Sequence, residues 1–413
     1  MFIPRPTGGG MLFLTAAAVA LGTAFMNVGL VTALIASLMS GFVLAGFLMA
    51  FFAASGFEIR REPSQGGNCG GKIALPLTVR NRTFLYRQPC VITEKLPFHP
   101  AGRAVWAVPA LRPHEQIRLE REFTAVRRGC FHLKKLQLIA GDPCGLFQVR
   151  KTFRLPGETS VMPGIRPLQN LSAGNGGKLS LTGDGQPQGR AGIGSDFFGV
   201  RPYRAGDETR YIHWRLSAAK QKLMIREFEA ASMERIFLIL DTESALIGQD
   251  PAENNFEALV SLAASVTEYF SSQYCILSFF TWYDGHPIQF NGDAAGIRIR
   301  ILELLTELTP GKKPVAALLA DTLENIPEGS VLYLLTMSDQ PEIKGMLRLL
   351  EDHHVRLYWI CAAKEYFPPV SDDEPMEMLL PAPEERFPQV FGPRLLTFQT
   401  PWEELFRDES EEA

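Results

Sequence analysis

A run of 52 residues without Asp, Glu, Lys, Arg or His, from position 6 to position 57, most constrains how this chain folds. One helix of that length would reach about 78 Å at 1.5 Å per residue, whereas a bilayer's hydrocarbon core is about 30 Å thick. Two helices, Met11–Met26 and Leu30–Ala54, fit better, with a turn around Asn27-Val28-Gly29. The sequence therefore predicts a two-helix transmembrane hairpin over residues 1–56.

The charges that flank this run predict its orientation. A cleaved signal peptide is the alternative, because Arg5 precedes an apolar stretch, but the apolar character continues to Ala54 without a polar break. Positive residues stand at both outer ends, and the connecting turn has none. The outer cations are Arg5, Arg60, Arg61 and Lys72. Because cytoplasmic ends carry the excess of Lys and Arg, both termini and the soluble domains are predicted to be cytoplasmic.

The soluble part changes its pattern along the chain. Residues 57–165 alternate between apolar and polar side chains, as in Lys72–Val79 and Phe131–Leu138, which predicts a small antiparallel β-sandwich. Residues 166–232 hold a loop with eight glycines between positions 168 and 195.

An α/β pattern follows. Buried strands alternate with amphipathic helices over residues 233–370, which predicts a mostly parallel sheet. The strands are expected at Ile236–Leu240, Cys275–Thr281, Val331–Thr336 and Val355–Ile360. Residues 371–413 are rich in Pro and Glu, and we expect a loosely packed tail.

The two soluble halves carry opposite charge. Residues 56–235 hold 29 Lys and Arg against 15 Asp and Glu, whereas residues 236–413 hold 11 against 30. A basic half suits the anionic cytoplasmic leaflet, and an acidic half suits a basic protein partner. The alternative is that the halves dock and neutralise each other. Six cysteines without a C-x-x-C pair indicate neither a zinc site nor a disulfide framework.

Candidate catalytic motifs are weak. Gly66–Lys72 satisfies G-x-x-x-x-G-K, but Ile73 replaces the Ser or Thr that would hold magnesium, and a strand pattern follows instead of a helix. The histidines show no ligand spacing, and no Ser lies in a G-x-S-x-G elbow. We therefore predict a protein without enzymatic activity, cofactor or metal. A hydrolase that uses Asp207 and His213 is the remaining enzymatic alternative.

The segment Gly194–Lys220 concentrates aromatic and charged residues. Four arginines, at positions 201, 204, 210 and 215, are interleaved with Tyr203, Tyr211 and Trp214. Guanidinium groups can stack on these rings or pair bidentately with Asp196 and Asp207, and Asp207 can cap a helix that begins near Glu208. The segment is either a docking or anion-binding surface, or a set of ion pairs that fastens the β-domain to the α/β domain.

This segment resembles the signature of the domain-of-unknown-function 58 family, roughly (E/D)F-x-x-x-R-x-Y-x-x-G-D-x-x-R-x-I-x-W-(R/K)-x-(S/T)-A-(R/K). The matching residues are Asp196, Phe197, Arg201, Tyr203, Gly206, Asp207, Arg210, Ile212, Trp214, Arg215, Ser217 and Ala218, and Arg204 lies among them. Only the last basic position is displaced, to Lys220. The resemblance implies a bacterial inner-membrane protein with a von Willebrand factor A-like (Rossmann-type) α/β domain, often encoded beside a MoxR-type AAA+ ATPase or a transglutaminase-like protein. It implies no established enzymatic activity.

Such A-type domains bind Mg²⁺ through D-x-S-x-S after the first strand, a loop threonine and a second Asp. Here Glu243 and Ala245 replace the two serines after Asp241, and Pro310–Pro314 replaces the threonine loop. Asp339 matches the second Asp. A divalent cation needs a full set of oxygen ligands, so the sequence predicts a degenerate site that binds no ion.

Two functions follow from these observations. The first is a non-enzymatic inner-membrane adaptor that presents its A-type domain to a cytoplasmic protein, with a MoxR-type AAA+ ATPase as the partner that the resemblance implies. The alternative is an anion-binding module in which the basic 56–235 region binds anionic lipid head groups or nucleic acid, of which nucleic acid is the less favoured.

Overall fold

The computed structural model describes residues 3–26, 29–169, 171, 191–204, 207, 209–229, 234–348, 355–368, 393–402 and 404–406. The chain divides into two compact units. The first contains residues 1–165 and 302–307, and the second contains residues 166–301 and 308–413. Each unit has its own hydrophobic core.

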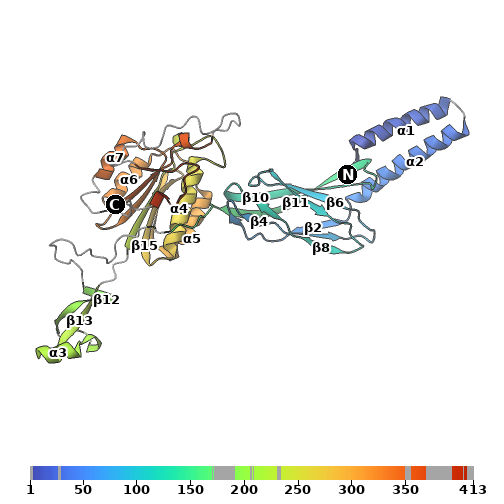
Figure 1. Cartoon of the computed structure of the whole chain (residues 1–413). Coiled ribbons are helices and arrows are strands. Elements are labelled where there is room, and N and C mark those ends of the chain that lie inside the picture. Colours follow the sequence, from blue (N-terminus) through green and yellow to red (C-terminus); the bar gives the residue numbers. More distant parts are fainter. Residues whose placement is uncertain are drawn as a thin grey trace. The chain divides into compact units, whose positions relative to one another are not determined.

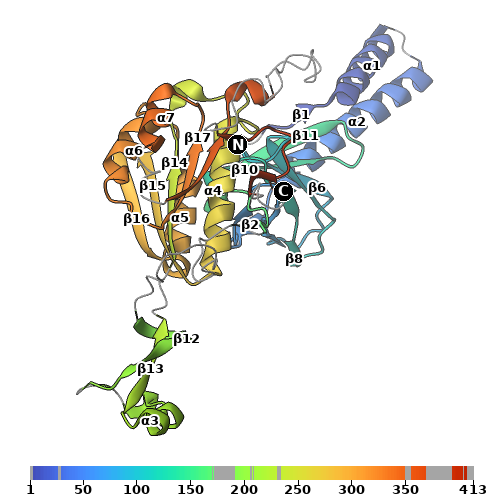
Figure 2. The same ribbon diagram turned by 60° about the vertical axis from the view of Figure 1, so that its left-hand side comes forward.

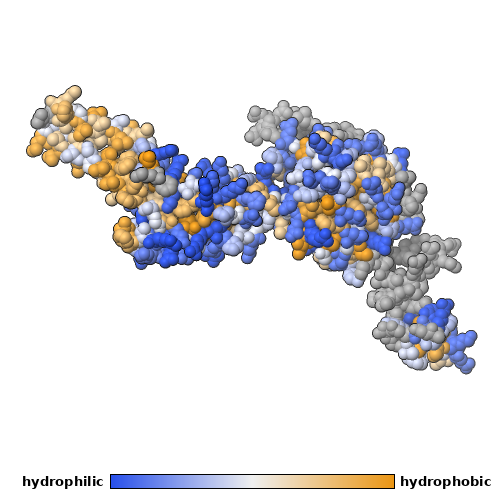
Figure 3. All heavy atoms as spheres, turned by 180° about the vertical axis from the view of Figure 1, so that it is seen from behind, coloured by the Kyte–Doolittle hydropathy of each residue, from blue (hydrophilic) through white to orange (hydrophobic). Residues whose placement is uncertain are grey.

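Two apolar helices lie near the start of the first unit, α1 (Gly8–Met26) and α2 (Leu30–Ala53) (Figure 1). With 19 and 24 residues, they are about 28 and 36 Å long at 1.5 Å per residue, which is long enough to cross a membrane. Their side chains are mostly exposed and form the hydrophobic arm in Figure 3. Two apolar helices are thus confirmed. Of the predicted turn, positions 27 and 28 lie outside the described residues.

The helix pair packs closely on the strands that follow. Strand β1 (Arg5–Pro6) pairs with β11 (Phe147–Met162). Gly10 in α1 lies so close to the Leu146 carbonyl that a Cβ atom there would overlap it, so only glycine fits. A small core of buried residues, consisting of Ala50, Leu146 and Phe147, packs against Phe13, Leu14, Val43 and Phe47.

Residues 57–162 form the predicted antiparallel β-sandwich. The strands are β2 (Phe57–Arg61), β3 (Gly67–Asn68), β4 (Lys72–Ala74), β5 (Leu77–Asn81), β6 (Cys90–Lys95), β7 (Arg103–Val108), β8 (Gln116–Leu119), β9 (Glu122–Thr124), β10 (Gly129–Gly141) and β11. One layer has the order β1-β11-β10-β6-β7, with the short β3 parallel to β11. The other strands form β2-β5-β8 and the pair β4-β9. The alternating run Lys72–Val79 does not form one strand, because Pro76 interrupts it and cannot donate to a ladder.

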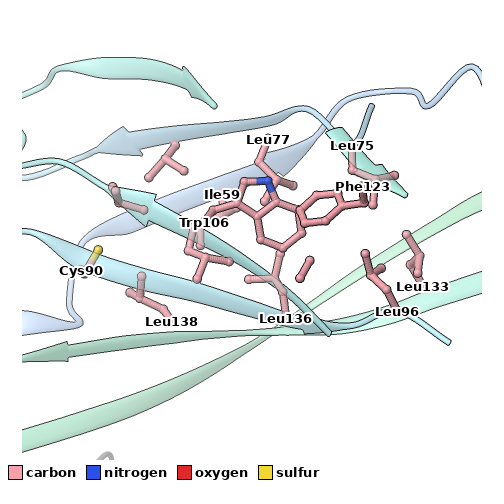
Figure 4. Close-up of a cluster of buried hydrophobic side chains, with 14 of the residues drawn as sticks. Ile59, Leu75, Leu77, Cys90, Leu96, Trp106, Phe123, Leu133, Leu136 and Leu138 are labelled. Carbon is pink, nitrogen blue, oxygen red and sulfur yellow. The ribbon is translucent and has the colours of Figure 1, made fainter. Parts of the chain in front are cut away.

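The sandwich core is built from the inward residues of both layers (Figure 4). Trp106 and Phe123 pack edge to face with ring centroids 5.1 Å apart. Leu77 and Leu136 are fully buried beside them, on strands of different sheets. Alternation along the strands therefore places apolar side chains between the layers and polar ones on the outside.

The second unit contains a six-stranded sheet with the order β16-β15-β14-β17-β18-β19. The strands are β14 (Glu234–Leu240), β15 (Cys275–Tyr283), β16 (His286–Asp293), β17 (Val331–Thr336), β18 (Arg356–Cys361) and β19 (Arg394–Leu395). All neighbours are parallel except β15 and β16, which form a hairpin at Asp284-Gly285. Both turn residues have positive φ, 49° and 77°, as a tight two-residue hairpin requires.

Helices cover both faces of this sheet (Figure 2). They are α4 (Asn255–Ser271), α5 (Ala294–Glu307), α6 (Val315–Leu323) and α7 (Pro341–Leu347). Side chains of α6 and α7 pack against Phe237, Ile239 and Trp359 on one face. On the other face, Phe270 of α4 contacts Tyr333, with ring centroids 5.5 Å apart. The predicted mixed α/β content is confirmed. Positions 349–354 lie outside the described residues.

The expectation of a loosely packed tail over residues 371–413 is wrong for residues 393–402 and 404–406. Strand β19 extends the sheet beside β18, and Trp402, Leu405 and Phe406 are buried. Phe406 lies 6.0 Å from the ring of Tyr333. The Pro- and Glu-rich composition obscured these few apolar residues, which close one face of the sheet. Positions 369–392 and 407–413 lie outside the described residues.

Candidate functional site

The family-like segment folds into a small unit that we call the signature module. It consists of β12 (Ala191–Pro202), the 3₁₀ turn η1 (Thr209–Tyr211), α3 (Trp214–Lys220) and β13 (Met224–Glu229). Strands β12 and β13 are antiparallel, with Arg201 opposite Ile225. Of the Gly-rich loop, positions 170 and 172–190 lie outside the described residues.

Local hydrogen bonds explain why α3 starts where it does. His213 is its N-cap, and the Nδ1 atom accepts the Leu216 N–H at 3.2 Å. The Ser217 hydroxyl accepts the Met224 N–H at 2.8 Å and thereby joins the helix to β13. A short 3₁₀ helix, η1, begins near the predicted position, and α3 begins seven residues after Asp207.

Asp207 pairs with Arg201. The two guanidinium nitrogens Nη1 and Nη2 donate to Oδ2 and Oδ1 at 2.7 and 2.8 Å, and the Arg204 N–H donates to Oδ2 at 2.7 Å. The hydrogen bonds from Arg201, followed by the one from the Arg204 backbone, lower the pKa of Asp207 to about 2. Both partners lie in the module, so this ion pair does not fasten the β-domain to the α/β domain. It holds the end of β12 to the turn that leads into η1.

The remaining signature residues divide into buried and exposed positions. Ile212 is buried together with Met224 and Ile225 of β13, and these three residues form the inside of the module. Trp214 is 66% exposed on the first turn of α3, and Arg204 and Arg215 are also exposed. Gly206 and the side chains of Asp196, Phe197 and Arg210 lie outside what the structure describes. The side chains of Trp214, Arg204 and Arg215 therefore lie outside the core of the module.

The tips of the parallel strands hold the second set of predicted residues. Asp241 follows β14, where the chain first leaves to β15 on one side and later returns to β17 on the other, so it lies at the topological switch point. Its carboxylate is fully buried and accepts two backbone N–H groups at 3.0 Å, from Glu243 to Oδ1 and from Met337 to Oδ2. Burial raises the pKa of Asp241 to about 6 despite these hydrogen bonds.

The other strand-tip residues are occupied by protein contacts. Asp339 forms an ion pair with Lys344 at 3.0 Å. Residues around Glu243 bond to the loop at Gly311, where Ser244 N–H donates to the Gly311 carbonyl at 2.6 Å. Ala245 has no side-chain oxygen. These residues do not fit a divalent cation, which needs several free oxygen ligands in near-octahedral arrangement. Among the described residues, no group of three or more His, Cys, Asp and Glu could hold a metal.

Sequence reasoning missed the groups that determine how Asp241 and Asp339 behave. The Met337 and Glu243 amides are backbone groups, which no side-chain motif can reveal, and Lys344 lies on α7, five residues after Asp339. The hydrolase alternative gains no support: Asp207 is held by Arg201, and His213 Nδ1 by a helix N–H. Burial raises the pKa of the Cys90 and Cys275 thiols to about 12 and about 11, so both are protonated at neutral pH.

Residues 199–273 match the family model described as "Protein of unknown function DUF58". The match covers the end of β12, η1, α3, β13, β14 and α4, and so includes both the Arg201–Asp207 pair and Asp241. "Uncharacterized protein YeaD" of Bacillus subtilis (strain 168) is 23% identical over 232 residues, which are 54% of this chain. The chain spans about half, 56%, of that relative's length.

Solved structures give only distant likenesses. The ASH/PapD-like domain of human CEP192 is 12% identical over 26% of this chain and 85% of its own, with a TM-score of 0.18. A beta-glucosidase from Listeria innocua is 15% identical over 25% of this chain and 16% of its own, with a TM-score of 0.16. Scores this low carry no inference about fold or function.

Proposed function

We propose that this chain is a non-enzymatic adaptor, anchored in the bacterial inner membrane by α1 and α2, with both termini and its soluble units in the cytoplasm. Two long helices with exposed apolar side chains support the anchor. The cations Arg5, Arg60 and Arg61 at the outer ends of the pair support the orientation.

The observation that carries the adaptor role is the exposed face of the signature module. Trp214 exposes 66% of its surface, and Arg204, Arg215, Lys220, Lys222 and Arg226 are exposed in the same small unit. Trp and Arg are the residues that most often anchor protein interfaces. The Arg201–Asp207 pair and the Ser217 hydrogen bond give this face a fixed backbone. A rigid unit that presents Trp and Arg to solvent is suited to docking.

The α/β domain is, in this proposal, von Willebrand factor A-like and independent of metal. A buried Asp at the switch point and an antiparallel edge hairpin support the von Willebrand factor A-like fold. The contacts that Asp241 and Asp339 make within the protein support the independence of metal. The proposed partner is a MoxR-type AAA+ ATPase, or a transglutaminase-like membrane protein. This choice of partner rests on the family resemblance.

Affinity capture from detergent-solubilised membranes, with and without an ATP analogue, tests the adaptor. We expect the wild-type chain to recover an AAA+ ATPase and the double variant Trp214→Ala, Arg215→Ala to lose it. The variant Tyr274→Ala is a matched control, because Tyr274 is 74% exposed outside the module. Recovery of no ATPase with the wild type would contradict the proposed partner.

A second candidate function uses the same face. Five exposed cations and an exposed Trp in one small module can also bind anionic lipid head groups or nucleic acid. In that case, binding of the full chain in neutral nanodiscs to anionic vesicles or oligonucleotides would fall steeply with salt and with Trp214→Ala. Absence of binding to both would remove this candidate.

A further inference from the structure

The loop between β5 and β6 exposes three consecutive large hydrophobic residues. Phe84, Leu85 and Tyr86 have 80%, 53% and 62% of their surface accessible. Single exposed apolar residues are common on soluble domains, but a contiguous group marks an interaction site. The hydrophobic surface in Figure 3 covers the helix pair and also part of the β-sandwich edge nearest to it.

Hydrogen bonds fix the shape of this loop. The buried Asn81 side chain donates through Nδ2 to the carbonyls of Leu85 and Arg112, at 2.8 and 3.0 Å. Arg87 and Leu111 exchange two backbone hydrogen bonds at 2.8 and 2.9 Å. The apolar residues are therefore held outward by a structured base, and their exposure is a property of the fold.

The same loop is attached to the end of α2. Arg87 is 6% exposed, and its Nη1 donates to the Phe52 carbonyl at 2.8 Å while its Nη2 donates to the Ser55 hydroxyl at 3.2 Å. The Phe52 carbonyl, which also accepts the Ser55 N–H at 3.0 Å, lies at the helix C-terminus, where a cationic side chain interacts favourably with the last carbonyls. The loop thus lies beside the last turn of the apolar helix, and the two belong to one compact unit.

A cavity of about 460 Å³ separates the loop from the helix. The α2 side of this cavity is lined by Leu48, Met49, Phe52 and Ala53, and the loop side by Leu85, Tyr86, Arg87 and Gln88. Leu48 to Ala53 is five residues, or about 7.5 Å along the helix. Interfacial segments sink about 5–10 Å into the boundary between head groups and acyl chains. The loop therefore reaches the depth of an interfacial segment when α2 spans the bilayer.

The charges around the loop agree with a membrane surface. Arg82 is exposed and shares the Glu58 carboxylate with Arg60, so this group carries a net positive charge. Burial, and secondly the nearby Arg87 guanidinium, lower the pKa of Lys151. Basic residues close to the bilayer are attracted to its anionic cytoplasmic leaflet.

We propose that Phe84, Leu85 and Tyr86 form a third membrane contact, which inserts at the boundary between head groups and acyl chains beside α2, with lipid filling the cavity between loop and helix. This contact rests on the proposed membrane anchor. It would fix the orientation of the β-sandwich against the membrane, because a domain held at α2 and at a second point cannot rotate freely about the helix end.

Tryptophan fluorescence in vesicles of phosphatidylcholine and phosphatidylglycerol tests this contact. Phe84→Trp and Tyr86→Trp are introduced separately into the full chain, and the wild-type emission is subtracted. We expect the added emission to be blue-shifted and largely lost in lipids brominated near the head group, with less quenching by lipids brominated at chain ends. Val105→Trp, on the exposed face of β7, is the control and should stay unquenched.

Flotation of the same samples separates this contact from the anchor. If the chain floats with the vesicles but neither added Trp is quenched, the loop lies in water or against a protein, and the third contact is wrong while the anchor stands. If the chain does not float at all, the anchor itself fails.

Discussion

Two aspartates in the family-matched part of the chain accept backbone hydrogen bonds in opposite surroundings. Asp207 is partly exposed in the signature module, and the Arg201 guanidinium lowers its pKa to about 2. Asp241 is fully buried at the strand tips without a cationic partner, and burial raises its pKa to about 6. The residue type alone therefore does not determine the role. A charged partner keeps Asp207 ionised down to low pH, whereas Asp241 is a buried structural acceptor whose pKa is raised to about 6.

The largest expected effect is the loss of the Asp241 side chain. Asp241→Ala leaves the Met337 and Glu243 N–H groups without their acceptor, and each unsatisfied buried group costs about 1–3 kcal/mol. We expect the free energy of unfolding of the α/β domain to fall by roughly 3–5 kcal/mol. Asp339→Ala is the control and should cost no more than about 1 kcal/mol, because its ion pair with Lys344 is partly exposed. Calorimetric unfolding of the full chain in detergent measures the loss of unfolding free energy in both variants. Equal losses would contradict the structural role given to Asp241.

The pH dependence of stability comes next. Asp241 has a folded pKa of about 6, above the unfolded value of 3.8, so the folded state binds its proton more tightly. The contribution of this raised pKa to the free energy of unfolding is fully present below pH 4 and is lost as pH rises through 6. The contribution is about 3 kcal/mol, at roughly 1.4 kcal/mol per pKa unit. Asp207, with its lowered pKa, contributes in the opposite direction, because its stabilisation is lost as pH falls from 4 to 2.

Calorimetric unfolding between pH 4 and 7 measures this effect, with Asp241→Asn as the reference. We expect the difference in unfolding free energy between wild type and variant to shift in favour of the wild type as pH falls from 7 to 4. A difference that stays constant over this range would show that Asp241 does not titrate there.

A smaller, local effect is expected in the module. Arg201→Lys keeps the positive charge but loses the planar fork that matches both oxygens of Asp207. Hydrogen–deuterium exchange should show faster exchange at the Tyr203 and His213 amides, which bond to Leu223 and Met224, with no change in β14 and β17. Arg215→Lys, at an exposed position, should leave all of these amides unchanged. Faster exchange in the sheet would mean that the pair supports more than the module.

The smallest expected effect is that of metal. Calorimetric titration of Mg²⁺ and Mn²⁺ into the full chain should give no saturable heat, because Asp241 and Asp339 are both engaged by the protein. A saturable heat that disappears in Asp241→Asn would contradict this account, and would show that the strand tips rearrange to bind an ion.

The sequence predicted the elements whose periodicity and composition are strong. These are the two apolar helices, the alternating strands of the sandwich, and β14, β15 and β17, which are continuous apolar runs. The tail was mispredicted because its acidic and proline residues dominate the composition, and two glutamates separate the buried Trp402 from the buried Leu405 and Phe406.

The candidate site was predictable only in part. The sequence predicted that arginines of this segment could pair bidentately with Asp196 or Asp207, but it did not identify Arg201 among the four as the partner of Asp207. The state of Asp241 was not predictable, since it depends on the amides of Glu243 and Met337 and on complete burial. The Phe84–Tyr86 loop gave no periodic signal, and its position beside α2 depends on the long-range contact of Arg87 with Phe52.

The signature module, and not the strand tips, is the proposed docking surface for the protein partner. The most direct test measures binding of a purified MoxR-type AAA+ ATPase from the same organism to the full chain in nanodiscs. We expect Asp339→Ala to bind the ATPase like wild type. The double variant Trp214→Ala, Arg215→Ala should bind it at least about tenfold more weakly, because two anchor residues are lost. Loss of binding with Asp339→Ala, with the module variant unaffected, would contradict this proposal and place docking at the strand tips.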